Sequence, residues 1–273
     1  MHKQIKKYRI NSIIESIIFA NPSNYLKFIE RNSFARKFLE KRKGQTLAEK
    51  LYFYKGIKDI KKKHRNQILK LLDDSKSQFR QDLWVLSQTD FKTNGFFVEI
   101  GTGGSEYNFS NTDILEKNFS WNGILVEPNP SYYELLRENR TCFIEKQPIY
   151  STTNQSIDFS IQYYGGLSGI RDHVLKDRLN TEIKSMSLKS LSLYDLILKY
   201  NAPSMIDYLS IDTEGSEYEI LKNMDFDKYK FRAITVEHHK RDYREKIYNL
   251  LETKGYRRIM HEWSDIEDWY VYE

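Results

Sequence analysis

From about residue 95 onward, short apolar runs alternate with amphipathic stretches, and this alternation limits the possible fold more than any other feature. Five runs have the length and residue types of buried strands: 96–100, 123–126, 142–144, 206–211 and 233–236. Five stretches between and after them have helical spacing: 109–119, 131–139, 191–200, 217–224 and 242–254. The pattern predicts an α/β fold with a largely parallel sheet, helices on both faces and, from 256–263 and 268–272, a hairpin at the sheet edge.

The first part of the chain has a different texture. Isoleucines recur at helical spacing between Ile10 and Ile18, and similar patterns return up to Leu72, which predicts several amphipathic helices. Residues 1–80 carry 21 Lys and Arg against 7 Asp and Glu, whereas the remaining residues carry 22 against 31. The overall charge of +5 therefore conceals two oppositely charged parts. We expect a basic helical extension over 1–88 and the α/β domain over 89–273.

Cysteine content and hydropathy limit the cellular setting. Cys142 is the single cysteine, which excludes an intrachain disulfide and a cysteine-based zinc site and fits a reducing compartment. The apolar stretch 13–20 is interrupted by Glu15 and is shorter than the roughly 20 residues of a membrane span. We expect a cytoplasmic protein. Its basic N-terminal helices suit three alternatives: packing on the α/β domain, a homodimer interface, or peripheral contact with the inner face of the membrane.

The turn after the first predicted strand has the composition of a cofactor loop. Glu99 lies in that strand, and the turn begins with Gly101, Thr102 and Gly103. Glycines permit close backbone approach to a ligand. The dinucleotide pattern G-x-G-x-x-G would need glycine where the chain has Glu106, which disfavours NAD. Glu127 follows the second strand and can bind both hydroxyls of a ribose. Together, Glu99 and Glu127 fit S-adenosylmethionine, which combines a cationic amino acid end with a ribose.

Other residues are candidates for contact with the same cofactor. Pro128 and Asn129 follow Glu127 directly. Tyr107 adjoins the loop and either shapes the donor pocket or packs in the core. Gln147, at the end of the third strand, is in a position to reach an adenine, with a purely structural role as the alternative. Asp212 is expected at the end of a neighbouring strand.

Several segments taken together resemble the FkbM family of methyltransferases: Phe-Val-Glu-Ile-Gly at 97–101, Trp-Asn-Gly-Ile-Leu-Val-Glu-Pro-Asn-Pro at 121–130, Asp-Thr-Glu-Gly-Ser-Glu at 212–217 and Ile-Thr-Val-Glu-His at 234–238. The resemblance implies a class I, Rossmann-like methyltransferase fold with a seven-stranded sheet, in which the ends of the first and fourth strands lie side by side. It also implies S-adenosylmethionine as donor and a hydroxyl acceptor on a sugar or secondary metabolite. The chain departs from the family pattern in its first loop and at Ser210, where many members have lysine.

The reaction that this resemblance implies requires removal of a proton from the acceptor hydroxyl. Asp212 and Glu214 follow the fourth strand, and Glu237, His238 and His239 end or follow the fifth, so all five are expected in one crevice. In one mechanism, His238 or His239 is the base and a carboxylate orients it. In the other, which we prefer slightly, Asp212, Glu237 and His238 bind Mg²⁺ or another divalent cation that acidifies the hydroxyl.

The leading expectation is therefore an S-adenosylmethionine-dependent O-methyltransferase that acts on a sugar hydroxyl, in a nucleotide-sugar or during surface polysaccharide or capsule synthesis. The alternative is a non-catalytic protein of the same fold that binds a membrane surface or nucleic acid through residues 1–88, although no known nucleic-acid module is recognisable there. Two local features remain open. Residues 151–190 either cover the site or form a surface loop, and Glu217, at a helix start, is expected only to favour the helix dipole.

Overall fold

The structure is a computed structural model that describes residues 60–103, 110–162, 165–174, 182–239, 242–259 and 266–273. The chain divides into two compact units, Met1–Asp73 and Asp74–Glu273. Within the first unit, the described residues contain a short 3-10 helix, η2 (Lys62–His64), and α5 (Arg65–Leu71). The helices expected before residue 60 lie outside the described residues. None of the helices among the described residues is both long and apolar enough to span a membrane.

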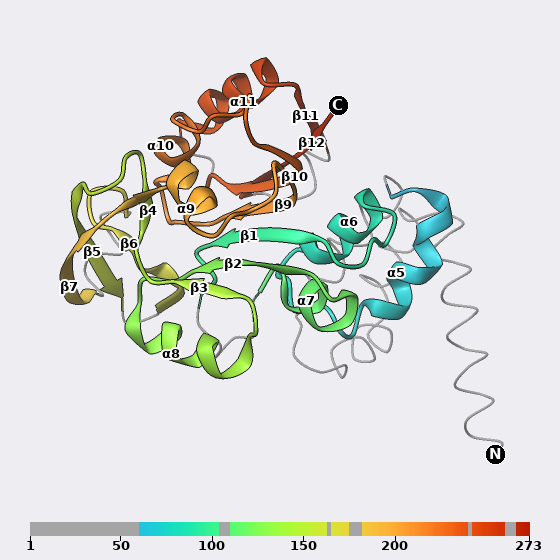
Figure 1. Ribbon diagram of the computed structural model, residues 1–273, viewed down its shortest axis with the longest axis horizontal. Coiled ribbons are helices and arrows are strands. Elements are labelled where there is room, and N and C mark those ends of the chain that lie inside the picture. Colours follow the sequence, from blue (N-terminus) through green and yellow to red (C-terminus); the bar gives the residue numbers. More distant parts are fainter. Residues whose placement is uncertain (1–59, 104–109, 163–164, 175–181, 240–241, 260–265) are drawn as a thin grey trace, which may run out of the picture. The chain divides into compact units, whose positions relative to one another are not determined.

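The second unit is built on a seven-stranded sheet (Figure 1). Its strands are β1 (Phe96–Ile100), β2 (Asn122–Val126), β3 (Phe143–Glu145), β9 (Met205–Ile211), β10 (Lys230–Glu237), β11 (Tyr256–Ile259) and β12 (Glu267–Tyr272), in the spatial order β11-β12-β10-β9-β1-β2-β3. Strand β12 is antiparallel to β10 and β11, and the other strand pairs are parallel. The expected mostly parallel α/β sheet is confirmed, including its edge hairpin.

The central strands are short, and nearly all of their side chains are buried, as is typical of a parallel sheet covered on both faces. Strand β1 pairs with both β2 and β9. Two backbone hydrogen bonds extend this pairing beyond the strand ends. The amide of Gly101 donates to the carbonyl of Val126 at 3.1 Å, and the amide of Asp212 donates to the carbonyl of Ile100 at 2.9 Å. The loops after β1, β2 and β9 therefore start at one edge of the sheet.

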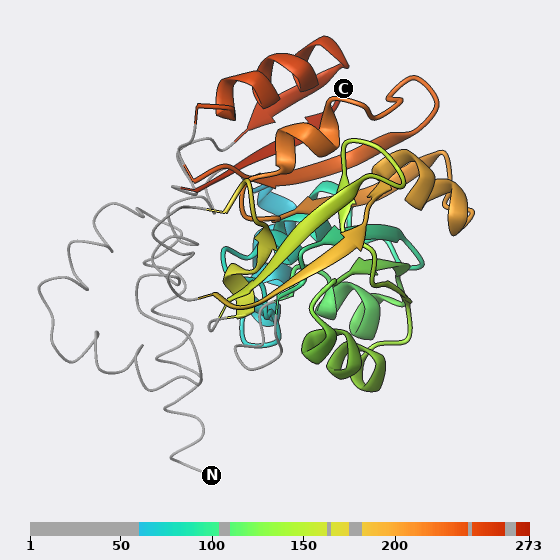
Figure 2. The same ribbon diagram turned by 90° about the vertical axis from the view of Figure 1, so that its left-hand side faces the viewer.

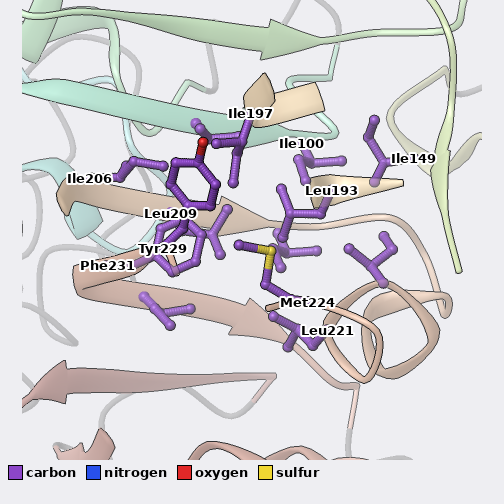
Figure 3. Close-up of a cluster of buried hydrophobic side chains, with 14 of the residues drawn as sticks. Ile100, Ile149, Leu193, Ile197, Ile206, Leu209, Leu221, Met224, Tyr229 and Phe231 are labelled. Carbon is purple, nitrogen blue, oxygen red and sulfur yellow. The ribbon is translucent and has the colours of Figure 1, made fainter. Parts of the chain in front are cut away.

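Helices cover the two faces of this sheet. They are α6 (Gln81–Gln88), α7 (Asp113–Phe119), α8 (Pro130–Asn139), α9 (Leu193–Lys199), α10 (Glu217–Leu221) and α11 (Arg244–Thr253). On one face, α9, α10 and α11 contribute to a buried cluster with the strands; Figure 3 shows Leu193, Leu209 and Leu221 in it. On the other face, α6 contacts α7 and β10, and the rings of Trp84 and Trp269 lie 4.9 Å apart.

Helix α6 belongs to the unit that contains the sheet. That unit begins at Asp74, whereas the boundary expected from the sequence lies between residues 88 and 89. Residues Gln81 to Ser87 are all buried, although three of the seven are polar. The change in charge along the chain marks where the basic part ends, but it carries no information about which helix packs on β10.

Residues 149–192 form two small sheets of their own. Strands β4 (Ile149–Tyr150) and β8 (Leu191–Ser192) pair in parallel. Strands β5 (Ser156–Gln162), β6 (Gly169–Ile170) and β7 (Glu182–Lys189) form an antiparallel sheet in the order β6-β5-β7, with a 3-10 turn, η4 (Gly165–Leu167), after β5. Figure 2 shows β5 and β7 side by side. In the sequence, residues 156–164 alternate in polarity in the way that indicates a strand, and β5 begins at the same residue as the middle strand of the three-stranded sheet.

Candidate functional site

A cavity of about 410 Å³ opens at the carboxyl ends of the parallel strands. Four strand ends supply most of its polar lining, in the crevice where α/β folds usually bind ligands. The contributing site residues are Glu99, Gly101, Thr102, Gly103, Glu127, Pro128, Asp212, Glu214, Glu237 and His239. Ten of the residues expected from the sequence therefore lie around one space.

The turn after β1 approaches the end of β9 so closely that its first residue has no room for a side chain. Gly101 has a φ of 82°, and a Cβ built on it would lie 1.6 Å from the carbonyl oxygen of Asp212. Gly103 has a φ of 62°, but a Cβ there would meet no atom of the described residues within 4 Å. The first glycine is thus required for contact between two strand ends, and the space beside the second is open toward a ligand.

Glu99 anchors the start of α7 in addition to lining the cavity. Its carboxylate accepts hydrogen bonds from the amide of Asn111 at 2.9 Å and from the hydroxyls of Ser110 and Thr112. Burial raises the pKa of Glu99, and the nearby Arg140 guanidinium opposes this shift. Several acceptor positions of Glu99 are thus occupied by residues 110–112. Its main role in the site is to fix the shape of the adjoining loop.

Glu127 follows the last residue of β2 and lies beside the turn after β1. Its carboxylate accepts hydrogen bonds from the amide of Asn129 at 2.8 Å and from the hydroxyl of Thr102 at 3.4 Å. Burial raises the pKa of Glu127 to about 7, although these hydrogen bonds oppose the shift. A buried carboxylate with unfilled acceptor positions is suited to bind a pair of sugar hydroxyls.

We expect donor binding to depend on the ionisation of Glu127. Below about pH 7 the carboxyl is protonated and accepts ribose hydroxyls less well, so affinity for S-adenosylmethionine should rise about tenfold between about pH 6 and pH 8, corresponding to one linked proton. Calorimetry at several pH values measures this change. Glu127→Gln should bind weakly and without the pH dependence, whereas the matched variant Glu145→Gln, at the end of the neighbouring β3, should retain it. An equal pH dependence in Glu127→Gln would contradict this assignment.

Three further donor-site candidates are placed differently. The side chain of Asn129 accepts a hydrogen bond from the amide of Ser131 and caps α8, and it does not line the cavity. Gln147 is directed toward the carbonyl of Lys189, at 3.4 Å, and is also absent from the cavity lining. Tyr107 lies outside the described residues.

The loops after β9 and β10 bring three potential proton or metal ligands together. Nε2 of His239 lies 2.6 Å from Oε1 of Glu237 and 3.5 Å from Oε2 of Glu214. One ligand atom from each of these residues lies within 4.8 Å of the others. Within the described part of the chain, the second oxygen of Glu237 is buried without a hydrogen-bond partner. The arrangement can hold an imidazole for proton transfer, or it can bind a cation.

His238 is directed away from the cavity. Strand β10 ends at Glu237, and the backbone of His239 is left-handed (φ 45°), so that the His239 imidazole lies against Glu237 whereas His238 faces Asp268. Its Nε2 lies 3.7 Å from the Asp268 carboxylate, a group that also binds Arg244. His238 is buried and does not line the cavity. The histidine that joins Glu237 in the cavity is therefore His239, and the ligand set Asp212, Glu237 and His238 does not come together there.

Asp212 and Glu237 both line the cavity, and their carboxyl groups interact with each other. Burial raises the pKa of both carboxyl groups, and the negative charges of neighbouring acids raise them further. Two carboxylates in contact require a proton or a cation between them. Asp212 and Glu237 therefore form a carboxyl pair in the cavity, one from the segment after β9 and one from the end of β10.

Glu267 on β12 is a cavity residue that sequence reasoning missed. It lies opposite Glu237 in the antiparallel ladder. Nε2 of Gln81 contacts both of its oxygens, at 2.8 and 2.9 Å, and Nε1 of Trp269 donates to it at 3.0 Å. Burial raises the pKa of Glu267 to about 7, and these hydrogen bonds oppose the shift. The sequence pattern predicts a C-terminal hairpin that contains this strand. Only the pairing of β12 with β10 in the structure places Glu267 opposite Glu237.

The insertion between β3 and β9 forms one wall of the cavity. Phe159 of β5 and residues 166–170, from η4 and β6, line it. Gly169 packs against the loop after β9, since a Cβ built on it would lie 3.0 Å from the carbonyl oxygen of Thr213 and 3.2 Å from Cβ of Glu214. Of the two alternatives open for residues 151–190, the structure supports a segment that borders the site.

Comparisons with known proteins give the following matches. The family model described as the methyltransferase FkbM domain matches residues 97–269. A comparison with curated proteins finds no match. Among solved structures, the METTL16 methyltransferase domain has 13% identity and a TM-score of 0.39; the match covers 70% of this chain and 64% of that one. A precorrin-6y C5,15-methyltransferase from Geobacter metallireducens GS-15 has 16% identity and a TM-score of 0.34, with coverage of 65% and 72%.

Proposed function

We propose, from the premise that this chain belongs to the FkbM family of S-adenosylmethionine-dependent methyltransferases, that its methyl acceptor is a hydroxyl group of a sugar. One observation carries the proposal: a single cavity joins the turn after β1 and Glu127 to the Glu214, Glu237 and His239 cluster. The first group of residues suits a donor with a ribose, and the second suits a hydroxyl that must lose a proton.

The residues of the donor half fit S-adenosylmethionine. Gly103 leaves the backbone of the turn uncovered by the other described residues, and Glu127 offers acceptor positions for ribose hydroxyls. The bound donor supplies an electrophilic methyl group on a sulfonium. The chain itself binds and orients the donor through the turn and Glu127, while the acidic end of the cavity favours a cation.

In the acceptor half, we assign the role of general base to His239. Its imidazole lies against the Glu237 carboxylate, which orients the ring and stabilises the cation formed when the ring accepts a proton from the acceptor hydroxyl. When the hydroxyl oxygen bonds to the methyl carbon, the bond between that carbon and the sulfonium sulfur would break, S-adenosylhomocysteine would leave as the neutral thioether, and the hydroxyl proton would pass to His239. A positioned base of this kind typically contributes about 10²- to 10⁴-fold to the rate.

The second route to the same chemistry is a divalent cation held by Glu214, Glu237 and His239. Carboxylates suit Mg²⁺ and Mn²⁺, and imidazole extends the set toward transition metals. The buried oxygen of Glu237, which lacks a hydrogen-bond partner among the described residues, supports this route. Such a cation would orient neighbouring hydroxyls of a sugar and acidify one of them.

A methyl-transfer screen tests the function and separates the two routes. The full chain, with S-adenosylmethionine, is incubated with free sugars and nucleotide-sugars, with and without EDTA, and products are identified by mass. We expect one added methyl group on a sugar. Unchanged turnover after exhaustive chelation supports the His239 route, whereas loss of turnover that Mn²⁺ or Mg²⁺ restores supports the cation route. Failure of the chain to bind the donor in calorimetry would contradict the proposed function.

The wider assignments belong to the same proposal. We propose a sugar or nucleotide-sugar as partner, a role in surface polysaccharide or capsule synthesis, and a cytoplasmic location. The homodimer interface and the membrane contact proposed for residues 1–88 depend on helices that lie mostly outside the described residues. The alternative non-catalytic function rests on those helices as well, whereas the cavity favours catalysis.

A further inference from the structure

One carboxylate outside the cavity connects the two loops that carry its reactive groups. Glu217, the first residue of α10, is fully buried. Its Oε1 accepts hydrogen bonds from the amide of Thr213 at 2.9 Å, the hydroxyl of Thr213 at 3.0 Å and the amide of Gly215 at 3.0 Å. Its Oε2 accepts one from the hydroxyl of Tyr243 at 2.7 Å. Four hydrogen bonds thus converge on a side chain that is not part of the cavity lining.

The segments joined in this way are those that carry Glu214 and His239. Glu214 stands between the two residues whose amides bind Glu217, and Tyr243 caps the start of α11 in the segment that follows His239. Glu214 has a φ of 61° and His239 a φ of 45°, a left-handed conformation that is unfavourable for residues with a Cβ. Such a conformation persists only where surrounding contacts hold it.

A helix-dipole role does not account for these contacts. An acid that only favours the dipole needs to lie near the first turn, and Glu219 satisfies this condition equally well. Glu219 instead pairs with Lys222, one turn along the same helix. Glu217 differs because its carboxylate turns back to donors that precede the helix. An amide in its place would keep one acceptor oxygen and present a donor to the other contacts.

We propose that Glu217 is a positioning residue, which holds the loop after β9 and the start of α11 together so that Glu214 and His239 face the acceptor. The catalytic effect of this positioning rests on the proposed function, methyl transfer to a sugar hydroxyl. Glu217 does not line the cavity, so it lies outside both the donor half and the acceptor half. Its removal should therefore impair the acceptor half and leave the donor half intact.

The test compares Glu217→Leu, which removes both acceptor oxygens, with Glu219→Leu, which changes the other acid of the same helix turn. We expect Glu217→Leu to lower kcat about 30-fold with little change in the Kd for S-adenosylmethionine, and Glu219→Leu to change neither. Tyr243→Phe, which removes the hydroxyl that links Glu217 to α11, should lower kcat about 5-fold. The matched variant Tyr248→Phe, whose hydroxyl meets the exposed Glu252 on α11, should be unchanged. Equal effects of Glu217→Leu and Glu219→Leu, or parallel loss of donor binding, would overturn the proposal.

Hydrogen exchange on the ligand-free chain keeps the test independent of the reaction. Glu217→Leu should speed exchange at the amides of Thr213 and Gly215 at least tenfold, while exchange in β1 stays unchanged. Tyr243→Phe should affect the start of α11 and leave those two amides protected. If the exchange results hold but no sugar is methylated, the proposed function fails and the link between the loops stands. If exchange at Thr213 and Gly215 is unaffected by Glu217→Leu, the positioning role is excluded whatever the acceptor.

Discussion

Replacing Gly101 by alanine is expected to abolish donor binding and to destabilise the fold by on the order of 3 kcal/mol. The new Cβ would lie 1.6 Å from the carbonyl oxygen of Asp212, and the residue would also have to keep a φ of 82°. Relief of this overlap requires the ends of β1 and β9 to move apart, which breaks the hydrogen bond from the amide of Asp212 to Ile100. A displacement of about 1 Å at a binding loop is enough to reduce function about 100-fold.

Gly103→Ala is the matched control, two residues along the same turn. It introduces the same methyl group at a similarly positive φ, but within the part of the chain that the structure describes no atom lies within 4 Å of the new Cβ. Only the backbone cost of about 1 kcal/mol is therefore expected. Urea unfolding and calorimetry with S-adenosylmethionine measure both variants. Similar stability losses in the two would show that the contact with Asp212 does not determine the need for glycine.

Replacing His239 by glutamine is expected to lower kcat by about 10²- to 10⁴-fold and to leave the Kd for S-adenosylmethionine unchanged. Glutamine retains much of the side-chain volume but cannot accept and release a proton near neutral pH. Its amide can still contact Glu237, which lies 2.6 Å from the imidazole. Single-turnover methyl transfer under saturating donor separates the chemical step from binding.

His173→Gln serves as its control. That imidazole binds the hydroxyl of Tyr150 at 2.9 Å and is not part of the cavity lining. The control variant should methylate at the wild-type rate. Turnover of His239→Gln within a few-fold of wild type would exclude His239 both as base and as an essential metal ligand, and would direct attention to Asp212 and Glu267.

The strands of the main sheet can be predicted from local sequence patterns, whereas β7 of the insertion between β3 and β9 cannot. Strand β1 is a run of apolar residues bounded by a glycine turn, and its burial on both faces makes that run readable from the sequence. Strand β7, by contrast, carries exposed residues at five of its eight positions and has little apolar periodicity. Its pairing with β5 depends on contacts across more than twenty residues of chain, which periodicity cannot reveal.

The sequence by itself determined which residue types reach the site, because strand ends in a parallel sheet meet at one edge. Glu99, Glu127, Asp212 and Glu237 follow this rule and line the cavity. Only the tertiary structure decided which of two adjacent histidines joins them. His239 points into the cavity and His238 toward Asp268, because β10 ends at Glu237, His238 meets a carboxylate of β12, and the left-handed backbone at His239 places its imidazole against Glu237. The contact of Gln81 with Glu267, residues 186 positions apart, likewise exists only once α6 packs on the sheet.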